Sequence, residues 1–355
     1  MIAIIQPLIP SYRHTFFFEL KKIYKIDIYC YESEHYIKKN IFDKSKMGSN
    51  PIFKISFGQF IYYSITKLLV KKYKILILML TPYHISTWIL LITKFLHGKK
   101  IILWGHGISI ENYEYETHKI NIIKKMMIYL ADEVWFYTDA ELQLWKSRIP
   151  SISAKSLDNT ISNISSLLEK PSIERDLLRK KHNIEDSLVV IYCARFDKKA
   201  RRTDLLKDVI EKTASMNILY IIIGDGRFKP DFSNYINVKD FGAIYDQNLK
   251  DDLFQLSDIY FQPGWVGLSI VEAMAYGKPI FTFERSKEIP QCVEYSYIVH
   301  NYNGYIAKDI DDLIQSMNNQ NSYTLNYFSL NCKKYVKDNL MTQNMIDKAS
   351  FSLKY

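Results

Sequence analysis

Cysteine is scarce in this sequence, glycine is sparse, and no apolar segment is both long and uninterrupted. The four cysteines lie far apart and form no CxxC pair, which argues against a disulfide framework and against a zinc site. The most apolar segment, residues 75–96, is interrupted by proline, histidine and lysine, so it does not predict a membrane-spanning helix. The first residues lack the basic region and the cleavage site of a signal peptide. We therefore expect a protein of the reducing cytoplasm.

Acidic residues are absent from residues 51–100, which contain eight lysines. The whole net charge of +9 lies in residues 1–165, with 22 lysines and arginines against 13 acidic residues, whereas residues 166–355 contain 25 of each. A basic surface suits an anionic membrane or a nucleic acid, but it can also be a solvated surface without a partner. No nucleic-acid-binding module accompanies the lysines. We therefore expect an anionic membrane surface as a partner and no nucleic acid.

Apolar segments alternate with amphipathic segments along the chain, which predicts an α/β protein with parallel sheets. Strands are expected at residues 2–5, 25–30, 75–80, 101–104, 187–193, 218–223, 258–261 and 279–283, the last of these ending the sheet. Helices are expected at residues 16–23, 59–72, 84–96, 120–130, 249–256 and 313–317, with an acidic loop at 111–116 and Asp139 as a helix N-cap. A chain of 355 residues predicts two domains, which we assign to residues 1–168 and 169–335, followed by a final helix in 336–355.

Residues 262–279, QPGWVGLSIVEAMAYGKP, combine a glycine-bearing loop with a short apolar helix. Ser269 is placed to cap the start of the helix. Glu272 is the single charge within it, and a buried carboxylate requires a cation or hydrogen-bond donors. The free N–H groups at such a helix start suit a phosphate, and Glu272 is placed to reach a ribose. The same pattern also fits a buried helix whose glutamate is paired within the protein.

Three further segments follow predicted strands and carry polar side chains. Five basic residues cluster after the strand at 187–193 and form either a diphosphate clamp or a solvated loop: Arg195, Lys198, Lys199, Arg201 and Arg202. His106 lies between two glycines directly after the strand at 101–104, where its imidazole would reach a substrate hydroxyl or would be incidental to a tight turn. Arg13 lies in the loop after the first strand, and such loops line the ligand crevice of an open α/β sheet.

The segment GLSIVEAMAYGKP resembles the donor-site signature of the retaining glycosyltransferases with the GT-B fold, the large family-four group, which includes membrane-polysaccharide enzymes with a PGxVGLS loop. The resemblance implies two Rossmann-like domains facing a central cleft, with the nucleotide-sugar on the second domain and the acceptor on the first. It also implies that the final helix, in residues 336–355, crosses back to the first domain. The family's second glutamate corresponds to Glu272, and its first falls on Gly264, so the contact with the donor sugar departs from the family pattern. Ala194 likewise replaces the family's usual glycine before Arg195.

The resemblance assigns a role to each candidate residue. His106 and Glu272 are the expected catalytic residues, and Arg13 and His106 the expected acceptor-binding residues. The donor would be bound by Arg195, Lys199, Arg201, Gly242, Ile244, Gly264, Gly267, Leu268, Ser269 and Glu272, with the base against the edge segment of residues 238–244.

The expected reaction is transfer of a sugar from a nucleoside-diphosphate donor to a lipid-linked or oligosaccharide acceptor, in assembly of a bacterial surface polysaccharide. We expect no cofactor and no metal, because the adjacent Asp251 and Asp252 fall within a predicted helix. The expected location is the cytoplasm, peripheral at the inner face of the membrane. Two alternatives remain: a nucleotide-sugar epimerase of the same fold, and a catalytically silent subunit of a glycan-assembly complex, suggested by the absent carboxylate at Gly264.

Overall fold

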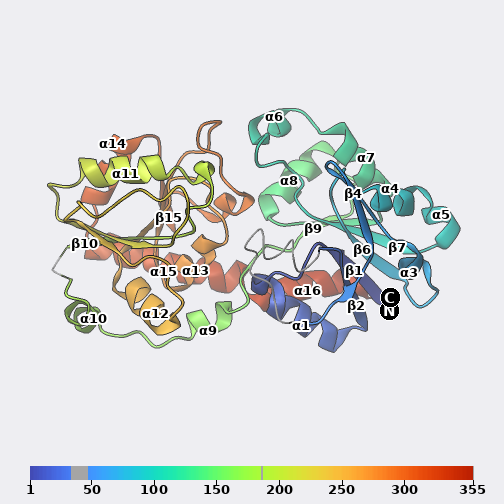
Figure 1. The fold of residues 1–355 in the computed structure, drawn as a ribbon, viewed down its shortest axis with the longest axis horizontal. Coiled ribbons are helices and arrows are strands. Elements are labelled where there is room, and N and C mark those ends of the chain that lie inside the picture. Colours follow the sequence, from blue (N-terminus) through green and yellow to red (C-terminus); the bar gives the residue numbers. More distant parts are fainter. Residues whose placement is uncertain (33–46, 185–186, 355) are drawn as a thin grey trace. The chain divides into compact units, whose positions relative to one another are not determined.

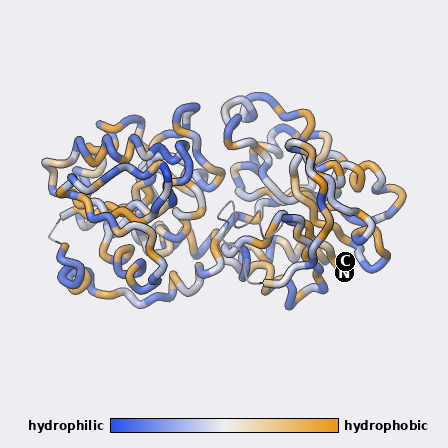
Figure 2. The backbone as a smooth tube through the Cα atoms, in the orientation of Figure 1, coloured by the Kyte–Doolittle hydropathy of each residue, from blue (hydrophilic) through white to orange (hydrophobic). Residues whose placement is uncertain are grey.

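A computed structural model describes residues 1–32, 47–184 and 187–354 of the chain. The chain divides into two compact units, one of residues 1–163 with 341–355 and the other of residues 164–340 (Figure 1). Each unit has its own core, and Figure 2 shows hydrophobic residues concentrated along the central strands of each.

A parallel sheet runs through the first unit, and its described strands lie in the order β3-β2-β1-β6-β7-β8-β9. The strands are β1 (Ile2–Gln6), β2 (Ile26–Cys30), β3 (Asn50–Pro51), β6 (Ile75–Met79), β7 (Lys100–Trp104), β8 (Glu133–Phe136) and β9 (Ala154–Ser156). Every residue of β1 is buried, as expected of a central parallel strand covered on both faces. The order reverses between β1 and β6, which is the topology of a Rossmann-like fold.

The helices of the first unit include the last helix of the chain. They are α1 (His14–Ile23), α3 (Thr66–Leu69), α4 (Ile85–Ile92), α5 (Lys94–His97), α6 (Tyr113–His118), α7 (Ile122–Leu130), α8 (Asp139–Arg148) and α16 (Thr342–Leu353), with a 3-10 turn η1 (Ser11–Arg13). Helix α16 packs against α1, and its Ser352 Oγ accepts a hydrogen bond from Trp135 Nε1 at 3.2 Å. The C-terminal segment is thereby tied to strand β8 of the first unit.

The prediction of a helix at residues 59–72 is wrong. The strands β4 (Lys54–Phe57) and β5 (Phe60–Tyr63) form an antiparallel hairpin, and only the short α3 follows it. The run of β-branched and aromatic residues in β5 favours a strand over a helix. Tertiary contacts also fix it, because Tyr63 donates its backbone N–H to Ser86 Oγ at 2.8 Å and its hydroxyl lies 2.8 Å from Thr87 Oγ1.

The second unit contains another parallel sheet, with its described strands in the order β12-β11-β10-β13-β14-β15. The strands are β10 (Leu188–Cys193), β11 (Ile218–Ile223), β12 (Val238–Asp240), β13 (Ile259–Phe261), β14 (Ile280–Phe283) and β15 (Gly304–Ala307). The helices are α9 (Ile164–Leu168), α10 (Arg175–Lys181), α11 (Thr203–Lys212), α12 (Gln247–Leu256), α13 (Ser269–Ala275), α14 (Ile310–Asn318) and α15 (Ser322–Asn339), with 3-10 turns η2 (Lys199–Arg201) and η3 (Val293–Tyr297). The order again reverses, between β10 and β13.

Three smaller predictions also need correction. The strand at residues 280–283 does not end the sheet, because β15 pairs with it in parallel. Strand β15 is only four residues long and half-buried, so its sequence has no distinct apolar signal. Part of the expected acidic loop forms helix α6. The N-cap of α8 is Thr138, whose side chain forms a capping box with Glu141, so Asp139 is the first helical residue.

Candidate functional site

Two loops that the sequence singled out meet in the second unit. They follow the adjacent strands β10 and β13, at the point where the strand order reverses, which is where open α/β sheets bind their ligands. Lys198 Nζ of the first loop lies 4.4 Å from the centroid of the Trp265 ring of the second. A Cβ atom at Gly264 would lie only 2.6 Å from the Ala200 carbonyl oxygen, so the close approach of the two loops requires glycine there.

The predicted diphosphate-binding cations differ in how firmly they are held. Arg201 is only 13% exposed, and its Nε lies 3.1 Å from Asp197 Oδ1. Arg195 is 57% exposed, and its Nε lies 3.7 Å from Asp197 Oδ2. Lys199 is exposed and belongs to the turn η2 that ends at Arg201. Asp197 thus lies between the two arginines and orients both.

Two buried glutamines hold the loop after β13 from within. Gln262, fully buried, donates its amide to the carbonyls of Gly264 and Trp265, and its Oε1 accepts from the hydroxyls of Tyr260 and Ser269. Gln291, also fully buried, accepts from Val266 N at 2.8 Å and donates to the Pro263 carbonyl. These hydrogen bonds fix the loop backbone from Pro263 to Val266. The expectation that Ser269 caps helix α13 is wrong, because the Ser269 hydroxyl is committed to Gln262.

The lone charge of helix α13 is paired, as its burial required. Glu272 lies in the first turn, and both of its carboxylate oxygens accept from Lys250 Nζ of α12, at 2.7 and 2.8 Å. The two side chains are 15% and 21% exposed. Burial alone would lower the pKa of Lys250, but the charge of Glu272, its hydrogen bonds to Lys250 and the nearby Cys193 together outweigh burial and raise that pKa above its usual value. No sequence pattern indicates Lys250 as the partner of Glu272, because it lies 22 residues earlier in the chain.

The candidate base-binding residues follow the edge strand β12. The Gly242 carbonyl accepts from Gly224 N at 2.7 Å, which ties this segment to the loop after β11. Ile244 is partly exposed, two residues farther along. These residues and the basic loop after β10, residues 195–202, all lie at the carboxyl ends of strands of the same sheet.

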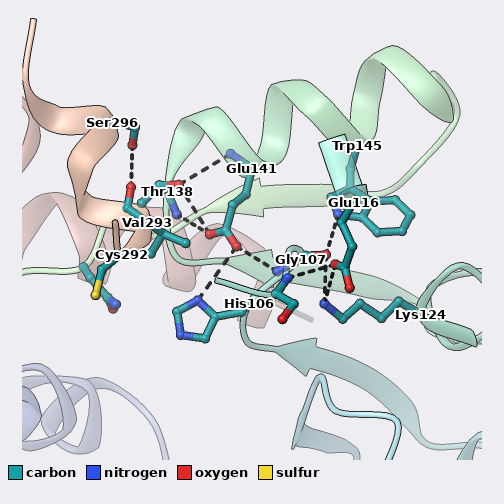
Figure 3. Close-up of polar contacts among 12 residues, drawn as sticks. His106, Gly107, Glu116, Lys124, Thr138, Glu141, Trp145, Cys292, Val293 and Ser296 are labelled. Atoms are coloured by element: carbon teal, nitrogen blue, oxygen red, sulfur yellow. Dashed lines mark hydrogen bonds and ion pairs between the residues drawn. The ribbon is translucent and has the colours of Figure 1, made fainter. Parts of the chain in front are cut away.

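His106 follows β7 in the first unit, and the Glu141 carboxylate lies close both to its side chain and to the backbone of the next residue, Gly107. Gly107 N donates to Glu141 Oε1 at 2.8 Å, and His106 Nδ1 lies 3.9 Å from the same oxygen (Figure 3). A side chain at residue 107 would collide with Phe136 and Trp145, so this backbone position requires glycine. Although the His106 side chain is 43% exposed, desolvation of its imidazole, together with the positive charges of Arg13 and Lys124, lowers the pKa of His106 to about 3. The imidazole is therefore neutral at pH 7 and can both donate and accept a hydrogen bond.

Arg13 and His106, the two predicted acceptor-binding residues, are brought together by Tyr137. The Arg13 guanidinium lies 4.8 Å from the centroid of the Tyr137 ring, and the His106 ring contacts the same ring edge-on at 4.3 Å. Arg13 is buried, lies over the Trp104 ring at 4.4 Å, and donates to Asn159 Oδ1 at 3.2 Å. Neither Tyr137 nor Glu141 carried a sequence signal, because each lies more than 30 residues beyond the histidine.

The described residues contain no group of His, Cys, Asp and Glu able to hold a metal ion. Asp251 and Asp252, the adjacent acidic pair, lie within α12 and are already paired: Asp251 with Lys170, and Asp252 with Lys181 and His182. Among the described residues, no helix has the length and apolar character needed to cross a bilayer.

Comparison with known proteins finds one family model and several solved structures that are similar to this chain. Residues 174–323 match the family model described as glycosyl transferases group 1. No curated protein matches the chain in sequence. Similar solved structures include Anabaena HepE in complex with UDP (15% identity, 99% of this chain and 98% of that chain, TM-score 0.65). The apo form of the lipopolysaccharide outer core galactosyltransferase WaaB is also similar (16% identity, 99% of each chain, TM-score 0.64), as is apo OtsA (9% identity, 100% and 99%, TM-score 0.65).

The fold prediction is confirmed: the chain has the GT-B architecture of two Rossmann-like domains. The family match covers most of the second unit, where the basic loop and Glu272 lie. Together with the shared fold it supports a glycosyltransferase, as the sequence predicted.

Proposed function

We propose that the protein transfers a sugar from a nucleoside-diphosphate donor to a lipid-linked or oligosaccharide acceptor in bacterial surface-glycan assembly. The observation that carries the proposal is the meeting of the basic loop and the loop after β13, at the point where the strand order reverses. HepE, which has the same fold, has been crystallised with UDP-glucose, and the family match extends over both loops. Retention of the anomeric configuration rests on the resemblance of residues 267–279 to the retaining family.

In the proposed donor site, Arg195, Lys199 and Arg201 bind the diphosphate and neutralise the charge that develops on it as the glycosidic bond breaks. Glu272 binds the ribose hydroxyls. Gly264 and Gly267, with the backbone of Leu268 and Ser269, border the phosphates, and the base lies against Gly242 and Ile244. The carboxylates of Asp251 and Asp252 are already paired with lysines. This favours a diphosphate bound by Arg195, Lys199 and Arg201 over one bound through a metal.

In the proposed acceptor site, Arg13 and His106 bind the acceptor at the carboxyl end of the first unit's sheet. His106 is neutral at pH 7 and would accept a proton from, or donate a hydrogen bond to, a reacting hydroxyl. We further propose that the first unit binds an anionic inner leaflet and so reaches a lipid-linked acceptor. Residues 66–74 support this, because exposed lysines lie there on both sides of the exposed apolar side chains of Leu69 and Val70.

The test is incubation of the purified protein with a panel of nucleotide-sugars, with and without lipid-linked oligosaccharide, followed by measurement of released nucleoside diphosphate. Release from at least one donor, accelerated by acceptor, is expected. Conversion of one nucleotide-sugar into its epimer would support the epimerase alternative instead. Tight binding without turnover in any combination would indicate a catalytically silent subunit.

A further inference from the structure

The side chain next to Gly264 is displayed in an uncommon way. Trp265 has φ of 53°, the left-handed region in which a bulky residue is rare. Non-glycine residues persist in this region when the surroundings over-determine them, and they cluster at ligand sites. Here the surroundings are Gln262, whose amide donates to the Trp265 carbonyl at 2.8 Å, and Pro290, whose carbonyl accepts from Trp265 N at 2.9 Å.

The neighbouring position cannot supply the side chain that the family uses. A Cβ at Gly264 would lie 2.6 Å from the Ala200 carbonyl oxygen and 3.1 Å from Arg202 Cγ. A glutamate there would displace the basic loop itself. In the proposed donor site, the loop must therefore contact the sugar through another residue. Trp265, which is partly exposed, is the large side chain next to Gly264.

The indole also lies beside the proposed diphosphate-binding loop. Lys198 Nζ is 4.4 Å from its ring centroid, so Trp265 borders the loop that contains Arg195 and Arg201. In a nucleotide-sugar the sugar is bonded directly to the diphosphate, so the two must bind side by side. One face of a pyranose ring presents C–H groups, whose slight positive charge and apolar surface match the negative face of an aromatic ring.

We propose that Trp265 contacts the donor sugar, in place of a carboxylate at position 264, and determines which sugar is used. This proposal rests on the proposed function, because it requires a nucleotide-sugar in the second unit. Sugars that differ in the direction of one hydroxyl present different C–H faces to the indole. The proposed role is thus specificity for the sugar, with no contribution to binding of the nucleotide.

The test is calorimetric titration of the full chain with UDP and with UDP-glucose. Trp265→Gly removes the ring and suits the backbone angle, Trp265→Phe keeps an aromatic face, and Tyr323→Ala, at a residue 80% exposed on α15, is the matched control. We expect Trp265→Gly to weaken UDP-glucose binding about tenfold or more while UDP binding stays within about twofold, with Trp265→Phe between. The control should leave both unchanged.

An equal loss for UDP and UDP-glucose would overturn the proposal, because the indole would then only shape the phosphate loop, and so would no loss for either. If the wild-type protein binds neither ligand, the titrations use GDP with GDP-mannose and ADP with ADP-glucose. Failure of every pair would refute the proposed function itself. If a pair binds and the ratio of its two affinities is the same in Trp265→Gly as in the wild type, only the role of Trp265 is refuted.

Discussion

Breaking the Lys250–Glu272 pair should separate its structural role from its ligand role. Glu272→Ala leaves the Lys250 ammonium without the carboxylate that accepts its two hydrogen bonds, at 2.7 and 2.8 Å. Loss of one partner of a fully buried pair costs about 3–5 kcal/mol. Because these side chains are 15% and 21% exposed, water reaches the site, and we expect a loss of about 2–3 kcal/mol in the free energy of unfolding.

The double variant Lys250→Met/Glu272→Ala removes both charges and should recover much of this stability, with a coupling free energy of about 1–3 kcal/mol. UDP affinity should behave differently. If Glu272 binds the ribose, its loss removes a charge-assisted hydrogen bond of about 1.5–3 kcal/mol, roughly 10- to 100-fold in affinity, in the single and the double variant alike.

Urea unfolding followed by circular dichroism measures the stability cycle, and calorimetry with UDP measures binding on the same samples. Recovery of wild-type UDP affinity in the double variant would refute the ribose role of Glu272 and leave it a structural partner of Lys250. A coupling free energy below about 0.5 kcal/mol would refute the structural part. The pair should also persist into alkaline solution. The pKa of Lys250 is raised in the folded protein, so its contribution is present below pH 10.5 and lost as the pH rises through the folded value.

Three further predictions concern separate parts of the two units. His106→Ala should lower turnover roughly 100-fold with little change in donor affinity. Because the pKa of His106 is lowered to about 3, any activity that needs its neutral form should be flat between about pH 6 and pH 8, and a sharp fall on acidification to pH 6 would contradict this. Arg195→Ala should weaken UDP binding by about 1.5 kcal/mol, which is the low end for a charge-assisted hydrogen bond, because the Arg195 side chain is 57% exposed. The control Lys207→Ala, on α11, should leave UDP binding unchanged. Equal UDP affinities of Arg195→Ala and the wild type by calorimetry would remove Arg195 from the site. The protein should float with anionic vesicles at low salt and be released as the Debye length falls to about 3 Å at 1 M salt. Binding should weaken when glutamine replaces Lys67, Lys71, Lys72 and Lys74. Protein that stays out of the vesicle fraction at low salt would indicate a solvated basic surface.

Local sequence was sufficient for the elements whose signal lies within the element itself. Strands such as β10 and β11 are continuous apolar runs, which is what burial on both faces of a parallel sheet demands. The loop that contains Gly264 and Gly267 and the basic loop were recognisable because glycine and clustered charge are visible in a few consecutive residues. The need of Glu272 for a partner was also deducible, since the cost of burying a lone carboxylate does not depend on the fold.

Only the tertiary structure decided which residues meet. Lys250 reaches Glu272 from another helix, and Gln291 supports a loop that begins 29 residues earlier. Arg13 and His106, which follow β1 and β7, both contact the ring of Tyr137, which follows β8. The helix that periodicity predicts at residues 59–72 is likewise wrong over β5, because Tyr63 is fixed in the hairpin by contacts with Ser86 and Thr87. Hydrophobic periodicity reports the environment of a residue, buried or exposed, and contains no information about its partner. The partner is set by strand order and by the packing of helices on the sheet, which arise only when the whole unit folds.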